Sequence, residues 1–84
     1  MDKMTLPELR VLLDASAVKR HDLYQHYNGG LYVIENLAIQ ESTQEPVVIY
    51  RPAWSDVWFT RTLQNFVEAV EVDGISTPRF KLIP

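Results

Sequence analysis

Residues 23–34 read Leu-Tyr-Gln-His-Tyr-Asn-Gly-Gly-Leu-Tyr-Val-Ile, two runs of strand-forming residues on either side of an Asn-Gly pair. Such runs around Asn28-Gly29 predict a tight antiparallel hairpin, because both central positions of the favoured turn need a positive φ. The glycine pair is not a phosphate-binding loop, since it lacks the Gly-Lys-Ser/Thr ending and leads into a strand. The stretch therefore indicates a β fold.

Strand patterns continue on the C-terminal side of this hairpin. The second strand is expected to reach Ile39, and the next run is β-branched in its first half. Thr62 is a suitable cap for one or two helical turns, and Pro78 must lie at an edge or a strand start. The further segments are expected at 47–51 (strand), 57–61 (strand), 62–68 (helical turn) and 70–82 (a final strand or hairpin around the turn 73–74).

The N-terminal segment has the signature of a helix. Thr5, Pro7 and Glu8 form a start signal, because Thr5 can cap, Pro7 suits the first turn and Glu8 can reach back to the Thr5 N–H. Leucines then recur at helical spacing, which predicts an amphipathic helix over 6–15. This helix is expected to cover an open end or face of the β part, or to contact a partner or a second copy.

These elements together predict a mainly β fold. We expect a small SH3-like, partly open antiparallel barrel with an N-terminal α-helix and one short helical turn before the last strands. The likeness to SH3-like barrels rests on that helical turn and is an analogy of fold, which does not give function. The chain has 84 residues, so we expect a single domain over 1–84 with the β-barrel core at 23–83.

Composition excludes several classes of protein. The chain has no cysteine, which removes disulfide frameworks and thiolate chemistry and favours a reducing cytosol. No signal peptide or membrane-spanning stretch is visible, so a cytoplasmic protein with no membrane contact is expected. The net charge of −3 and the pI of about 5.2 disfavour a partner bound mainly through phosphates.

Nothing in the sequence predicts catalysis or a cofactor. His21 and His26 are the only histidines, and no third ligand is spaced to complete a metal site with them. His26 is better interpreted as a half-buried, hydrogen-bonded side chain. No nucleophile motif occurs, and paired carboxylates such as Glu68 and Glu71 suit a solvated face. The chain is therefore expected not to be an enzyme, and to hold no metal and no cofactor.

Aromatic and Arg residues are the best candidates for a binding surface. Trp54 lies in the loop Pro-Ala-Trp-Ser-Asp, where its ring is either an exposed anchor or a lid folded on the barrel. Arg61 shares a strand face with Phe59 and suits a carboxylate or a stacked base, although ion pairs of Arg51 and Arg61 with Glu45 or Glu68 are the simpler account. The candidate surface comprises Tyr24, His26, Tyr50, Trp54 and Arg61.

The function that these residues suggest is a non-enzymatic protein- or peptide-binding module. One alternative is a module that binds single-stranded nucleic acid, because small barrels stack bases on aromatic rings beside Arg. A second alternative is a structural homodimer that pairs through the N-terminal helix, with Leu6, Leu9 and Leu13 as a self-complementary stripe.

Residues 24–80 also resemble a small bacterial family known only as a domain of unknown function (number sixteen fifty-three). The resemblance rests on spaced blocks: Tyr24, His26-Tyr27, Gly29 and Tyr32; Glu41-Ser42-Thr43 and Glu45; Val47-Val48 and Tyr50; Phe59, Arg61 and Phe66; Glu68 or Glu71 with Val70 or Val72; and Pro78-Arg79-Phe80. The chain departs from the family pattern at Asn28 (usually Lys), Phe59 (usually Trp) and Thr62 (usually Pro). The resemblance implies a compact bacterial β domain and no established activity.

Overall fold

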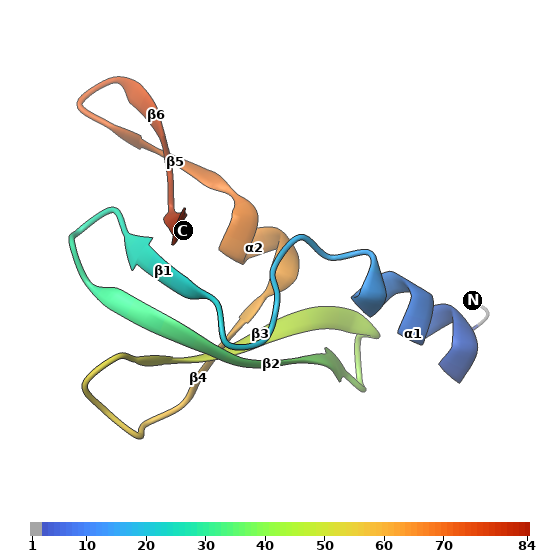
Figure 1. Cartoon of the computed structure of the whole chain (residues 1–84). Helices are drawn as coiled ribbons and strands as arrows, with labels where there is room; N and C mark the ends of the chain where they lie inside the picture. Colours follow the sequence, from blue (N-terminus) through green and yellow to red (C-terminus); the bar gives the residue numbers. More distant parts are fainter. Residues whose placement is uncertain (1–2) are drawn as a thin grey trace.

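The computed structural model describes residues 3–84 and contains seven strands and two helices (Figure 1). The elements are α1 (Leu6–Asp14), β1 (Leu23–His26), β2 (Leu31–Gln40), β3 (Glu45–Pro52), β4 (Phe59–Thr62), α2 (Leu63–Val67), β5 (Ala69–Val72), β6 (Ile75–Pro78) and β7 (Phe80–Ile83). The predicted mainly β character, the N-terminal helix and the helical turn before the last strands are confirmed.

The strands form one antiparallel sheet and one separate hairpin. The sheet has the order β4-β3-β2-β1-β7, and β5 and β6 form a separate two-stranded sheet. Within residues 3–84, the edge strands β4 and β7 do not pair with each other, so the sheet stays open and forms no closed barrel. The physical reason is α2, which follows β4 directly and packs on β3 and β4, so that side chains and not main-chain pairing fill the gap.

The two tight turns differ in their backbone geometry. Asp73 and Gly74 have φ of 52° and 77°, as a two-residue turn of the favoured type requires. At the first hairpin only Gly29 is left-handed, with φ of 101°, and its N–H donates to the His26 carbonyl at 2.8 Å. The expectation that Asn28 also has a positive φ is therefore wrong: the turn is one residue longer and closes at Gly29.

A β-bulge in β2 changes which residues face the core. The pairing of β2 with β3 shifts between Ile34 and Asn36, and Glu35 is the extra residue. Ile34 lies opposite Tyr50, and Leu37 lies opposite Val48. Because directly opposed residues share a face, the bulge lets both Ile34 and Leu37 face the core although they are three positions apart.

The core lies between the sheet and α2, on what we call the inner face of the sheet. Phe66 of α2 is 1% exposed, and Ile34 and Val48 beneath it are fully buried. Thr62 caps α2 as expected, since its hydroxyl accepts from the Asn65 N–H at 3.1 Å. The remaining buried members of this cluster are Val18, Tyr24, Tyr50 and Phe80.

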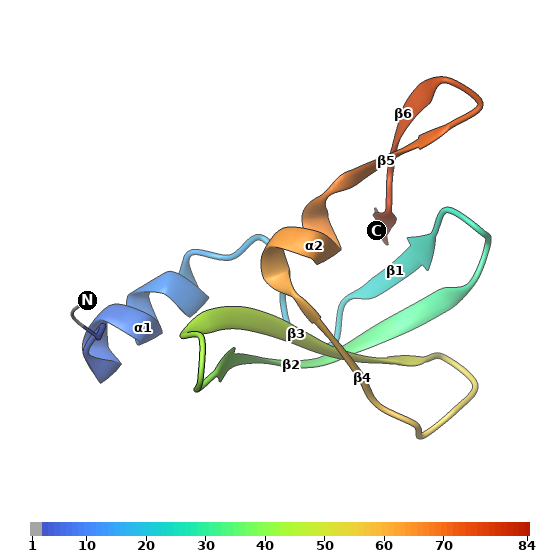
Figure 2. The same cartoon turned by 180° about the vertical axis from the view of Figure 1, so that it is seen from behind.

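Helix α1 and the β5–β6 hairpin extend the molecule at opposite ends (Figures 1 and 2). The radius of gyration is 13.8 Å, whereas a compact chain of this length has a value of about 12 Å. The expected cap of α1 is present, because Thr5 and Glu8 exchange both hydrogen bonds of a capping box. No helix in residues 3–84 has the length and apolar character needed to cross a membrane.

Candidate binding surface

Four of the five sequence-predicted residues meet around two phenylalanines. Tyr24 and Tyr50 contact the Phe66 ring edge-on, with centroids 5.1 and 5.6 Å away. Phe80 stacks on Phe66 at 4.1 Å, and His26 lies 4.9 Å from Phe80. With Tyr32, which is 5.5 Å from Tyr50, these rings form what we call the aromatic cluster. The predicted shared face of Tyr24 and His26 is confirmed by their pairing.

Burial divides this cluster into an interior and a rim. Tyr24 and Tyr50 are 7% and 6% exposed. Their rings therefore pack beneath the surface and are not accessible to a partner. Burial raises the pKa of the Tyr24 phenol above its usual 10.0, and the charge of Asp22 raises it further. His26 is half-buried and accepts from the Asn28 N–H through Nδ1 at 3.2 Å. The accessible part of the cluster is therefore its rim.

Arg61 joins the cluster, and within residues 3–84 no carboxylate is paired with it. Its Nε donates to the Tyr50 hydroxyl at 3.0 Å, its Nη1 donates to Asn65 Oδ1 at 2.5 Å, and its guanidinium carbon lies 5.7 Å from the Phe80 ring centre. The ion pairs found in residues 3–84 are Arg10–Asp14 and Arg51–Glu35. The simpler account of Arg61, an ion pair with Glu45 or Glu68, is therefore wrong.

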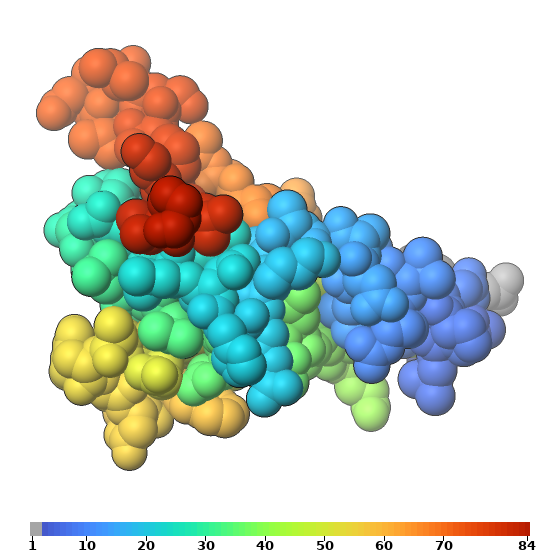
Figure 3. All heavy atoms as spheres, viewed as in Figure 1, coloured from blue at the N-terminus to red at the C-terminus, as the bar shows by residue number. Residues whose placement is uncertain are grey.

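Trp54 lies apart from the cluster and is 85% exposed. It belongs to the loop between β3 and β4, and no ring pair within residues 3–84 includes it, so it is not a lid on the core. Figure 3 shows this loop, in yellow, protruding at the end of the molecule away from α1. Large apolar side chains follow it along the chain: Val57 (55% exposed), Trp58 (60%) and Phe59 (45%). We call Trp54, Val57, Trp58 and Phe59 the exposed patch.

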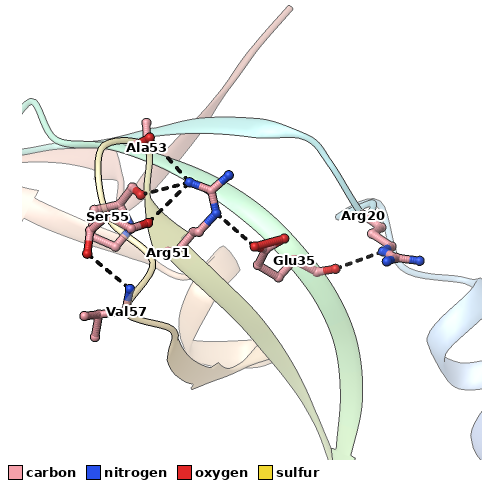
Figure 4. Close-up of polar contacts among 7 residues, drawn as sticks. Arg20, Glu35, Arg51, Ala53, Ser55 and Val57 are labelled. Carbon is pink, nitrogen blue, oxygen red and sulfur yellow. Dashed lines mark hydrogen bonds and ion pairs between the residues drawn. The ribbon is translucent and has the colours of Figure 1, made fainter.

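Arg51 fixes the loop that carries Trp54 (Figure 4). Its Nη1 donates to the carbonyls of Pro52, Ala53 and Ser55 at 3.3, 3.4 and 3.4 Å. Its Nε donates to Glu35 at 2.9 Å, and both side chains are only about a quarter exposed. One guanidinium therefore holds the loop on one side and a carboxylate on the other, which limits the conformations open to Trp54.

Sequence reasoning missed Glu35, because its position depends on the bulge. Arg20 donates from Nε to the Glu35 carbonyl at 3.1 Å, so the bulged residue is held through its main chain as well as its carboxylate. One signal in the sequence could have revealed the bulge. The apolar residues that face the core have even numbers before Glu35 (32 and 34) and odd numbers after it (37 and 39). Asn65 and Tyr32 were missed because neither belongs to a motif.

The described residues place large apolar side chains and part of the Arg61 guanidinium at the surface of the domain. Exposed apolar side chains such as those of the exposed patch are typical of recognition surfaces. In the part of the chain that the structure describes, no group of three or more His, Asp or Glu is placed to hold a metal ion. The fold and the surface together define a small, open antiparallel β domain with an aromatic and Arg-bearing rim.

Comparisons with known proteins give the family of this domain. The model of the family described as "Protein of unknown function (DUF1653)" matches residues 22–82, so the chain belongs to that family. A crystal structure of a DUF1653 protein from Bordetella bronchiseptica is 31% identical, covers 77% of this chain and 87% of its own, and superposes with a TM-score of 0.67. No curated protein matches the chain. The resemblance seen in the sequence is thus confirmed.

Proposed function

We propose that this chain is a non-enzymatic protein- or peptide-binding module of the bacterial cytoplasm. The observation that carries the proposal is Trp54, whose ring is 85% exposed on a loop that Arg51 fixes. A large ring left in water by a folded protein gains free energy when a partner covers it, and Trp is enriched among residues that dominate binding energy. A fixed loop also loses less conformational entropy on binding.

The surface that we propose consists of the exposed patch, the guanidinium of Arg61 and the half-buried His26. Tyr24 and Tyr50 were also predicted for this surface from the sequence. Because both are buried, they contribute by packing against Phe66 and not by direct contact with a partner. We retain the SH3-like interpretation as part of this proposal, because the helical turn α2 precedes the strand that returns to β1.

We expect capture of protein partners to depend on Trp54. The experiment is an affinity pull-down from bacterial lysate, run with and without nuclease, in which the wild type is compared with Trp54→Ala and with Trp54→Ala/Arg61→Ala. Loss of a hot-spot Trp weakens binding by roughly 2 kcal/mol or more, about thirtyfold, so the retained proteins should disappear from both variants. Ile75→Ala is the matched control, because Ile75 is 67% exposed on the distant β5–β6 hairpin.

Two results would contradict the proposal. Equal retention by the wild type and the double variant would remove the proposed surface. Retention of nucleic acid, or loss of the proteins on nuclease treatment, would favour the single-stranded nucleic-acid module instead, and binding would then fall steeply with salt concentration.

A homodimer through α1 is the second candidate, and the exposure of Leu6 favours it. Leu6 is 81% exposed and borders a groove that Leu9, Leu13 and Ile39 also line. Leu9 is buried against the chain's own sheet, so a second copy would contact mainly Leu6 and Val11, which is 68% exposed. We expect sedimentation at high protein concentration to give a dimer mass that Leu6→Glu returns to a monomer; a monomer for the wild type removes this candidate.

A further inference from the structure

The edge strand β4 has the properties of a docking strand for an extended peptide. Among the strands of residues 3–84 it lies at the border of the sheet and pairs on one side only, with β3. In an antiparallel pair, alternate residues turn their N–H and C=O groups away from the partner strand. Within the described chain, no main-chain hydrogen bond outside β4's pairing with β3 involves residues 59–61. These outward groups are free to accept another strand.

The other strand edges carry the features by which proteins prevent such pairing, and β4 lacks most of them. Strand β7 contains Lys81 and lies between Pro78 and Pro84, β6 contains Pro78, and β5 contains Glu71. Lysine, proline and acidic side chains at an edge discourage the addition of a strand. Strand β4 reads Phe-Thr-Arg-Thr and follows the exposed Val57 and Trp58.

Arg61 is the one charge on β4, and it determines which strand the edge can accept. It lies on the inner face with Phe59, since Phe59 is opposite Tyr50 and Arg61 is opposite Val48. Its Nε and Nη1 already donate to Tyr50 and Asn65, and its remaining N–H groups are not buried. A second copy of β4 would bring another Arg and no hydrogen-bond acceptor. A carboxylate, in contrast, would accept hydrogen bonds from the remaining N–H groups of the Arg61 guanidinium.

We propose that β4 binds an extended acidic peptide segment by β-strand addition, with a carboxylate against Arg61 and an apolar side chain against Phe59. In an antiparallel pairing, the ligand residue opposite Arg61 precedes the residue opposite Phe59 by two positions. The recognised pattern is therefore acidic–any–apolar, read from the N-terminus of the ligand. The proposal rests on the peptide-binding function above and names the mode and the chemistry of its ligand.

The test uses a short fluorescent peptide of alternating threonine and valine, with glutamate placed two residues before phenylalanine. Fluorescence polarisation should show binding to the wild type, and replacement of the glutamate by lysine should weaken it at least tenfold. Arg61→Glu should reverse this preference and bind the lysine peptide better. Circular dichroism of Arg61→Glu checks that the variant is folded.

A second measurement needs no variant of the protein. Methylation of the peptide nitrogens that face β4 should abolish binding, whereas methylation of the alternate nitrogens should leave it unchanged. In amide NMR spectra, the peptide should shift the signals of residues 59–61 and slow the exchange of their outward N–H groups. Equal binding of both methylated peptides, or shifts confined to α1, would overturn the proposal.

The two proposals can fail separately. If wild-type protein captures partners through Trp54 and the glutamate peptide does not bind at about millimolar concentration, the binding module stands and strand addition at β4 is wrong. If the peptide binds β4 and Trp54→Ala has no effect on capture from lysate, the edge is a docking site and the Trp54 surface is wrong.

Discussion

Phe66→Ala should lower the free energy of unfolding by about 3–5 kcal/mol, the usual cost of removing a buried aromatic ring. Phe66 is 1% exposed, its ring stacks on Phe80, and it contacts Tyr24 and Tyr50 edge-on. The five-residue helix α2 supplies this ring, and within residues 3–84 no strand joins the edges β4 and β7. A domain of this length has a total stability of only about 4–13 kcal/mol, so the variant should be close to unfolding at room temperature.

Urea denaturation followed by circular dichroism measures this effect. Val67→Ala is the matched control, because Val67 is the next residue of the same helix and is 61% exposed. Its change should stay below about 0.5 kcal/mol, as is usual for surface positions. Similar losses for the two variants would mean that Phe66 is not the centre of the core.

Arg51→Ala should both destabilise the fold and abolish the binding that depends on Trp54. The substitution leaves the Glu35 carboxylate, which is 21% exposed, without its cation and removes three hydrogen bonds to loop carbonyls. Loss of one partner of a largely buried pair costs about 2–3 kcal/mol here, below the value for full burial. The loop then samples more conformations, so Trp54 binds a partner at a greater entropic cost.

The measurement combines urea denaturation with the pull-down described above. Arg10→Ala is the control, because the Arg10–Asp14 pair is exposed (71% and 67%) and such pairs contribute about 0–1 kcal/mol. Glu35→Gln separates the hydrogen bond of Arg51 from its ion pair, since the amide oxygen still accepts from Arg51 while the negative charge is removed. If a folded Arg51→Ala protein captured the same partners as the wild type, binding through Trp54 would not depend on the hydrogen bonds of Arg51 to the loop.

Local signals in the sequence were sufficient to predict the helix caps and one of the two tight turns. Thr5 and Thr62 cap the helices they were expected to cap, and Asp73-Gly74 forms the expected two-residue turn. These features depend on residues within a few positions of one another. Closure of the barrel depends on the distance between β4 and β7, which are far apart in the chain, and no local signal encodes it. The prediction of a two-residue turn at Asn28-Gly29 was wrong because a two-residue and a three-residue loop both fit Asn-Gly-Gly.

The candidate surface was predictable in part. Strand alternation was enough to place Tyr24 with His26 and Phe59 with Arg61. The exposure of Trp54 could not be decided from its loop, because it is set by contacts of Arg51 with three carbonyls and by a glutamate sixteen positions earlier. Hydrogen bonds between distant segments leave no periodic trace in a sequence.

The bulge at Glu35 allows the sheet and the Trp54 loop to change independently in evolution. A chain that lost this one residue would pair β2 with β3 in regular register, and Ile34 and Leu37 would still both face the core. The same deletion would remove the carboxylate that holds Arg51. A single-codon deletion could thus release the Trp54 loop while the sheet persisted. Under the proposed function, a relative that lacks Glu35 should differ in its partner and not in its architecture.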